Sequence, residues 1–218
     1  MNSLEKELQN NHYRVVIFGS ARIKKGDRIY EEVYKLAKNV GEIGYDVVTG
    51  GGPGLMEAAS AGHEKGTPDN KSHTVGLNIK LPFEQKANTH LDLVIEHDRF
   101  SSRLDEFVAL ANIVVVTPGG IGTALELLYA WQLIQVKHSC KIPIILMGTM
   151  WKDFLKWVKK WPLSHGLMNE ADMDYILYAK GSKDALRLIK EAHKEFIKAG
   201  PDVCVNWKKY KIQHIPGM

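Results

Sequence analysis

The sequence predicts an α/β protein with a Rossmann-like, doubly wound and mostly parallel sheet, helices on both faces, and a single domain. Three observations lead to this prediction. Short runs of β-branched and aromatic residues alternate with helix-length segments along the 218 residues. The run at residues 113–116, IVVV, is typical of a central strand buried on both faces. Glycine-rich loops follow three of the expected strands.

The first half of the chain supplies most of the expected strands. Residues 13–18 form an apolar run that ends at Gly19, and apolar residues recur at helical spacing over 27–43. Pro53 suits the first turn of the helix that follows the second strand. The expected strands are 13–18, 45–49, 73–79 and 91–95, the helices are 27–43, 53–65 and 100–111, and 82–90 is expected as a polar loop.

The second half continues the same alternation of strands and helices. The expected strands are 113–116, 142–146 and 175–178, and the expected helices are 121–136, 151–161 and 183–199. The pattern contains no internal repeat and no linker. We therefore expect a polar N-terminal segment at 1–12, one nucleotide-binding domain at 13–199, and a C-terminal tail at 200–218.

Composition and charge narrow the class of protein. The chain is 44% hydrophobic and 25% charged, as is usual for globular proteins. Its net charge of +4 comes without a cluster of lysines and arginines, so we expect no nucleic-acid partner. Residues 1–11 are polar and no apolar run is long enough to cross a bilayer, which predicts no membrane partner and a cytoplasmic location.

Metal and cofactor chemistry finds no support in local motifs. The histidines do not form an H-x-H or HExxH pattern, so we expect surface or packing roles for His63, His73, His90 and His97 and no metal site. No lysine stands beside a recognisable pyridoxal-phosphate motif. We therefore expect no cofactor.

Ligands of doubly wound sheets bind beyond the carboxyl ends of the strands, so the three glycine-rich loops are the candidate binding loops. The first contains Gly19 and Ser20, which offer a tight turn, a hydroxyl and a backbone N–H. The second, residues 50–54, is GGGPG, whose amides can face an anion beside a helix start. Ordinary tight turns remain the alternative explanation for both loops.

The third loop, residues 118–126, reads PGGIGTALE and carries the most chemistry. Its glycines allow backbone amides to approach a ligand, and Thr123 adds a hydroxyl at the helix start. Glu126 lies near the same face of the first helical turn, where it suits a sugar hydroxyl or an attacking water better than a phosphate. The alternative is that Thr123 and Glu126 form an N-terminal capping pair.

The third loop, together with GGGPGLMEAA at residues 50–59, resembles the LONELY GUY family of phosphoribohydrolases, often labelled lysine decarboxylase-like. The resemblance implies hydrolysis of the N-glycosidic bond of a nucleoside 5′-monophosphate, such as AMP or a cytokinin riboside monophosphate. It also implies a homodimer with the active site near the subunit interface. By the same resemblance, the catalytic residues are Arg103 and Glu126.

The expected binding residues come from the glycine-rich loops and from this resemblance. They are Gly19, Ser20, Gly51, Gly52, Gly54, Arg99, Gly119, Gly120, Gly122 and Thr123. Two positions depart from the family pattern: Leu104 replaces a common lysine, and Ile121 replaces a common aromatic residue. Proteins of this fold also include a molybdenum cofactor carrier, so a non-catalytic nucleotide- or cofactor-binding protein is the alternative function.

Overall fold

The computed structural model describes residues 12–69, 71–80 and 87–199, and these contain one sheet of seven parallel strands. Each strand is short, most are rich in β-branched residues, and several are buried along their whole length. The strands are β1 (Arg14–Phe18), β2 (Asp46–Thr49), β3 (Thr74–Ile79), β4 (Leu93–His97), β5 (Ile113–Val116), β6 (Ile144–Met147) and β7 (Ile176–Ala179).

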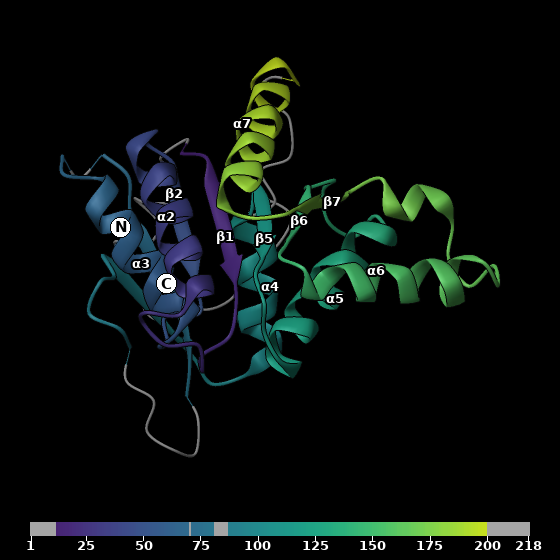
Figure 1. The fold of residues 1–218 in the computed structure, drawn as a ribbon, viewed down its shortest axis with the longest axis horizontal. Coiled ribbons are helices and arrows are strands. Elements are labelled where there is room, and N and C mark those ends of the chain that lie inside the picture. Colours follow the sequence, from purple (N-terminus) through teal and green to yellow (C-terminus); the bar gives the residue numbers. More distant parts are fainter. Residues whose placement is uncertain (1–11, 70, 81–86, 200–218) are drawn as a thin grey trace, which may run out of the picture.

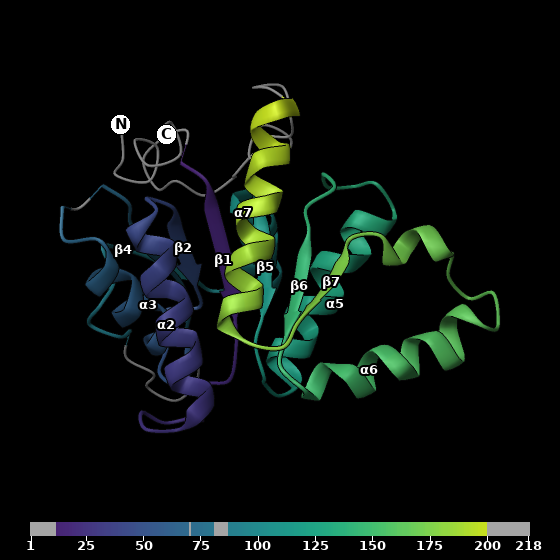
Figure 2. The ribbon, with the colours of Figure 1, turned by 45° about the horizontal axis from the view of Figure 1, so that its top comes forward.

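Helices cover both faces of the sheet, as Figures 1 and 2 show. The helices α2 (Arg28–Glu42), α3 (Leu55–Gly66) and α7 (Ser182–Ala199) share one apolar core with the sheet. The helices α4 (Phe100–Leu110), α5 (Ile121–Gln135) and α6 (Met150–Val158) share the other. Two cores on opposite faces of a parallel sheet confirm the predicted Rossmann-like, doubly wound fold.

The strand order β4-β3-β2-β1-β5-β6-β7 places a topological switch point between β1 and β5. The chain moves outward from β1 through β4 and then returns to the other side of β1. The two central strands pair in parallel from Val15 with Ile113 to Phe18 with Val116, so they end side by side. A crevice for a ligand is expected at this point of such a sheet.

Two helix boundaries differ from the sequence prediction for local reasons. The helix expected from Pro53 begins at Leu55, because Gly54 is its N-cap with φ +73°. The helix expected over 151–161 ends at Val158 and continues as a π-helical turn, Lys159–Leu163. Pro162 lies in this turn and has no amide hydrogen, so the α-helical hydrogen-bond pattern cannot continue through it.

Several expectations fall on residues outside the described ranges. These are the polar segment before residue 12, most of the loop expected at 82–90, and the tail at 200–218. Among the described residues, no helix has both the length and the apolar character that a membrane span requires. The expected division of the chain and the cytoplasmic location stay predictions.

Candidate active site

The three glycine-rich loops meet beyond the carboxyl ends of β1, β2 and β5. The amide of Ser20 donates to the carbonyl of Pro118 at 3.2 Å, which joins the first loop to the third. The amide of Leu55 donates to the carbonyl of Ser20 at 2.9 Å, which joins the second loop to the first. These bonds hold the backbones of all three loops together at the switch point.

Close packing explains two of the glycines in this junction. A Cβ atom on Gly19 would lie 2.3 Å from Thr117 Oγ1, and one on Gly54 would lie 2.4 Å from the carbonyl oxygen of Ser20. Gly54 also has a positive φ of +73°, which side chains rarely tolerate. Both residues are therefore needed for the loops to approach, and their predicted contact with a phosphate stays a prediction.

The second loop is tied to the segment before β4 by Asn88, which the sequence analysis missed. The side chain of Asn88 donates to the carbonyls of Gly51 at 3.2 Å and Gly52 at 3.1 Å. Its backbone amide also donates to Gly51 at 2.8 Å. Gly51 takes a φ of +71°, and its amide donates to the hydroxyl oxygen of Thr49 at 3.1 Å. No local motif around Asn88 predicts this contact.

Arg103 from α4 and Glu126 from α5 are brought together. Arg103 Nη1 lies 3.4 Å from Glu126 Oε1, and the two side chains are only 9% and 13% exposed. Arg103 lies near the start of α4 and Glu126 lies in the second turn of α5, so the pair bridges two helices. The structure thus unites the two residues that the resemblance marks as catalytic.

The guanidinium of Arg103 is positioned by groups that the sequence analysis did not single out. Its Nε donates to the carbonyl of Leu77 at 2.7 Å, and its Cζ lies 5.0 Å from the ring centroid of Phe107. A Cβ atom on Gly50 would lie 2.3 Å from its Nη2. Gly50 is therefore the residue that makes room for the arginine.

Burial changes the acid–base properties of this pair. Loss of hydration raises the pKa of Glu126 to about 7, and the nearby charge of Arg103 only partly opposes the rise. Loss of hydration also lowers the pKa of Arg103, while Glu126 opposes that change. Because an arginine stays charged throughout the physiological range, only Glu126 can exchange a proton near neutral pH.

The start of α5 has open backbone amides and free space around its glycines. Its N-cap is Gly120, and no side chain caps the helix, so the first backbone N–H groups lack a side-chain partner. A Cβ atom at Gly120 or Gly122 would meet nothing within 4 Å. The predicted alternative of a Thr123–Glu126 capping pair is wrong, because neither side chain caps this helix.

The remaining expected binding residues occupy different environments. Thr123 is buried at 4% exposure, and a Cβ atom on Gly119 would lie 2.1 Å from its hydroxyl oxygen. The Thr123 hydroxyl therefore packs against the loop at Gly119. Ser20 Oγ accepts from the amide of Arg22 at 3.1 Å, and Arg99 is exposed at the N-cap of α4. Their contacts with a substrate stay predictions.

The chain matches a known protein family over more than half of its length. The model of the family described as "Possible lysine decarboxylase" matches residues 56–189, which include Arg103 and the whole third loop. The chain belongs to this family. The resemblance to the LONELY GUY proteins is thereby confirmed.

The chain is similar in sequence to one curated enzyme and similar in fold to several solved structures. A pyrimidine/purine nucleotide 5′-monophosphate nucleosidase from Escherichia coli (strain K12) is 28% identical over 201 residues, which cover 84% of this chain and 43% of the relative. The chain thus spans less than half the length of that relative. A molybdenum cofactor binding protein from Rippkaea orientalis superposes with a TM-score of 0.63 at 19% identity, covering 84% of this chain and 98% of that protein. A molybdenum cofactor carrier protein from Chlamydomonas reinhardtii gives 0.61 at 20% identity, covering 84% and 99%.

Proposed function

We propose that the protein hydrolyses the N-glycosidic bond of a nucleoside 5′-monophosphate and releases the free base and ribose 5-phosphate. The observation that carries this proposal is the buried Arg103–Glu126 pair, with Nη1 3.4 Å from Oε1, in the same loop cluster as the uncapped start of α5. The similarity to a nucleotide 5′-monophosphate nucleosidase supports the same reaction class.

Glu126 acts on the sugar in this proposal. Cleavage of a glycosidic bond passes through an oxocarbenium-like transition state, which a nearby carboxylate stabilises. The ionised Glu126 would hold a ribose hydroxyl or orient the attacking water, and it would stabilise the developing positive charge. With a pKa raised to about 7, the same carboxyl can also accept a proton from water near neutral pH.

The phosphate binds at the start of α5 in this proposal. Backbone N–H groups of Ile121 and Gly122 would donate to its oxygens, where Gly120 leaves open space. Arg103 would hold the Glu126 carboxylate in place and add positive charge near the anion. Gly51, Gly52 and Ser20 would line the opposite wall.

The proposal extends to the base and to the assembly. AMP and cytokinin riboside monophosphates are the candidate substrates, and no cofactor enters the reaction. A homodimer is proposed through α5, on which Ile121, Leu125 and Leu128 are 90%, 46% and 48% exposed. These residues are spaced i, i+4 and i+7, so they form one apolar stripe beside the candidate active site.

The direct test is release of adenine from AMP, followed by chromatography, for the native protein and for Glu126→Gln. We expect release by the native protein and a loss of at least about 100-fold in the variant, because proton transfer and charge stabilisation at this position are removed. Binding of AMP by the variant, measured by calorimetry, should persist. Equal turnover by the two proteins would remove Glu126 from the reaction.

A carrier of a nucleotide or cofactor is the second candidate. The two molybdenum cofactor proteins share this fold over more than four-fifths of the chain, and this similarity supports a carrier function as the second candidate. It predicts that the native protein binds nucleoside monophosphates without releasing base from any of them. Substrate turnover therefore separates the two candidates in the experiment above.

A further inference from the structure

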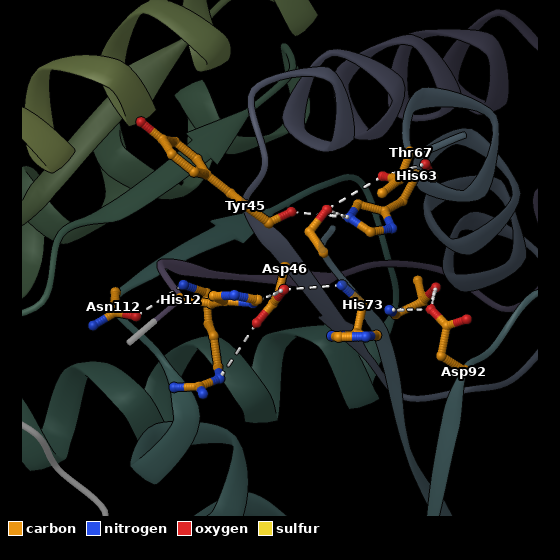
Figure 3. A network of polar contacts seen from close by, with 11 residues as sticks. His12, Tyr45, Asp46, His63, Thr67, His73, Asp92 and Asn112 are labelled. Atoms are coloured by element: carbon orange, nitrogen blue, oxygen red, sulfur yellow. Dashed lines mark hydrogen bonds and ion pairs between the residues drawn. The ribbon is translucent and has the colours of Figure 1, made fainter. Parts of the chain in front are cut away.

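Two histidines and an aspartate gather at the amino ends of β1, β2 and β3, at the opposite edge of the sheet from the candidate active site. His12 lies just before β1, Asp46 is the first residue of β2, and His73 lies just before β3 (Figure 3). The three side chains come together because parallel neighbouring strands start at the same edge. None of them belongs to the loops described above.

Asp46 is the buried centre of this cluster. Its side chain is 0% exposed. Oδ1 accepts from the backbone amide of His73 at 2.9 Å and contacts Nδ1 of His12 at 3.0 Å. Oδ2 is buried and has no hydrogen-bond partner, although Nε of Arg14 lies 3.7 Å away. A buried carboxylate oxygen without a hydrogen bond is costly, and Arg14 at 3.7 Å offsets that cost only in part, so Oδ2 is open to a further ligand.

The two imidazole rings are more exposed than Asp46. Their centroids are 6.0 Å apart and their planes differ by 14°, so the rings face each other without close contact. His12 keeps 30% of its side chain exposed and His73 is half-buried. One ligand atom from each of the three residues lies within 4.8 Å of the others. An ion can therefore reach the cluster from solvent.

We propose that His12, Asp46 and His73 bind a divalent transition-metal ion of the Zn²⁺ class. Two imidazole nitrogens and one carboxylate oxygen form a common zinc ligand set, with water completing a tetrahedron. Bonds of about 2.1 Å place tetrahedral ligand atoms about 3.4 Å apart, so ligand atoms that now lie within 4.8 Å of one another must approach by at most about 1.4 Å. The carboxylate is already oriented by the backbone of His73.

Arg14 shapes this site as a neighbouring positive charge. Its guanidinium already offsets part of the charge of Asp46, which weakens the attraction between the carboxylate and a dication. We therefore expect a site of moderate affinity that exchanges its ion with solvent. Because the ion would join three separate strand starts, it would stabilise the amino edge of the sheet.

The spacing of the three residues explains why no sequence motif marks this site. His12 and Asp46 are 34 positions apart, and Asp46 and His73 are 27 apart. Local metal-binding motifs place ligands within one turn or one loop. Only the pairing of β1 with β2 and of β2 with β3 brings these side chains together.

The test uses Co²⁺ as a spectroscopic probe of the full-length protein after treatment with a chelator. We expect one equivalent of Co²⁺ to produce the visible absorption of a four-coordinate ion, and Zn²⁺ to displace it. Added Zn²⁺ should raise the melting temperature of the native protein. His73→Ala and Asp46→Asn should abolish the absorption and the melting shift, whereas His165→Ala, a histidine elsewhere on the surface, should preserve both.

Two outcomes would overturn the proposal. One is the absence of a four-coordinate Co²⁺ spectrum at millimolar metal. The other is an unchanged spectrum in His73→Ala. His12→Ala provides a second variant at a half-exposed position, should Asp46→Asn fail to fold. Circular dichroism of the metal-free proteins separates loss of metal binding from loss of structure. Release of adenine plays no part in these readouts.

Discussion

At the scale of single residues, the proposed reaction depends on one buried pair. Arg103 and Glu126 are each mostly removed from water, yet Nη1 and Oε1 are 3.4 Å apart and not in tight contact. Burial outweighs the attraction of the arginine, so the pKa of Glu126 is raised to about 7. A carboxyl that is half ionised near neutral pH is suited to proton transfer, which a surface ion pair would not provide.

The pH profile of the reaction follows from this value. If the ionised Glu126 is required, kcat/KM should rise with pH and level off above an apparent pKa of about 7, because the carboxyl is protonated below that value. The measurement is AMP hydrolysis across a series of buffers. Phosphate monoesters titrate near about pH 6, so AMP binding to Glu126→Gln over the same range is the control. A flat profile between about pH 6 and 8 would contradict the assignment.

Gly50 controls the position of the arginine. A methyl group there would lie 2.3 Å from Arg103 Nη2, so Gly50→Ala must displace the guanidinium. We predict a fall in kcat/KM of about 100-fold, since displacements of about 1 Å in a catalytic group have effects of that size.

The matched control for Gly50 is Gly181→Ala. A Cβ atom on Gly181 would approach only the Glu32 carboxylate, at 3.0 Å, on the opposite face of the sheet from Arg103. Its activity should equal that of the native protein. Native activity in Gly50→Ala, measured alongside, would show that the arginine can move without consequence.

At the scale of elements, the start of α5 has no side-chain cap, which agrees with its proposed role in binding phosphate. An aspartate or asparagine at an N-cap normally satisfies the first amides of a helix, but Gly120 leaves them open. The backbone angles of Gly120, φ −96° and ψ −151°, are accessible to other residues. Neither strain nor crowding therefore requires glycine at this position, which is consistent with a ligand occupying the space.

Replacement of Gly120 by aspartate should separate stability from binding. We predict that Gly120→Asp keeps or raises the melting temperature, because the carboxylate caps the helix. The free energy of unfolding should rise by up to a few tenths of a kcal/mol. The same charge should raise the KM for AMP by about tenfold through repulsion of the phosphate. Gly120→Asn supplies the cap without the charge, so a KM equally high in both variants would argue against an anion at this helix start.

At the scale of the whole molecule, strand order decides where the loops meet. The return of the chain across β1 places β5 beside it, so the loops that follow these two strands end at one edge. The opposite edge collects the starts of β1, β2 and β3, where His12, Asp46 and His73 lie. One parallel sheet thereby carries two separate candidate sites.

A charged residue introduced on α5 tests the proposed dimer. Leu128 is 48% exposed in the single chain, and Leu128→Asp should place a carboxylate in the subunit contact. We predict that sedimentation of the native protein gives twice the 24.5 kDa chain mass, and that the variant gives the single mass. Leu167→Asp, at a residue 76% exposed and outside α5, is the control. Native protein that sediments as a single chain would refute this dimer.

Most of the fold could be predicted from local sequence. Helical spacing and β-branched runs depend on near neighbours, so the order of strands and helices was predicted within a few residues throughout the described chain. The boundaries moved where a single residue changed the backbone, as at Gly54 and Pro162. The three loops and the family were also identified from sequence, because their motifs are contiguous.

Contacts between distant residues required the tertiary structure. Three such contacts join segments far apart in the chain. They are the packing of Arg103 against Gly50, the hydrogen bonds of Asn88 to the second loop, and the cluster around Asp46. The raised pKa of Glu126 likewise depends on burial between α4 and α5, which no spacing in the sequence reveals. The sequence by itself thus determined the elements, the loops and the identity of the candidate pair. The tertiary structure decided their environment, because burial and proximity arise only when separate strands and helices pack together.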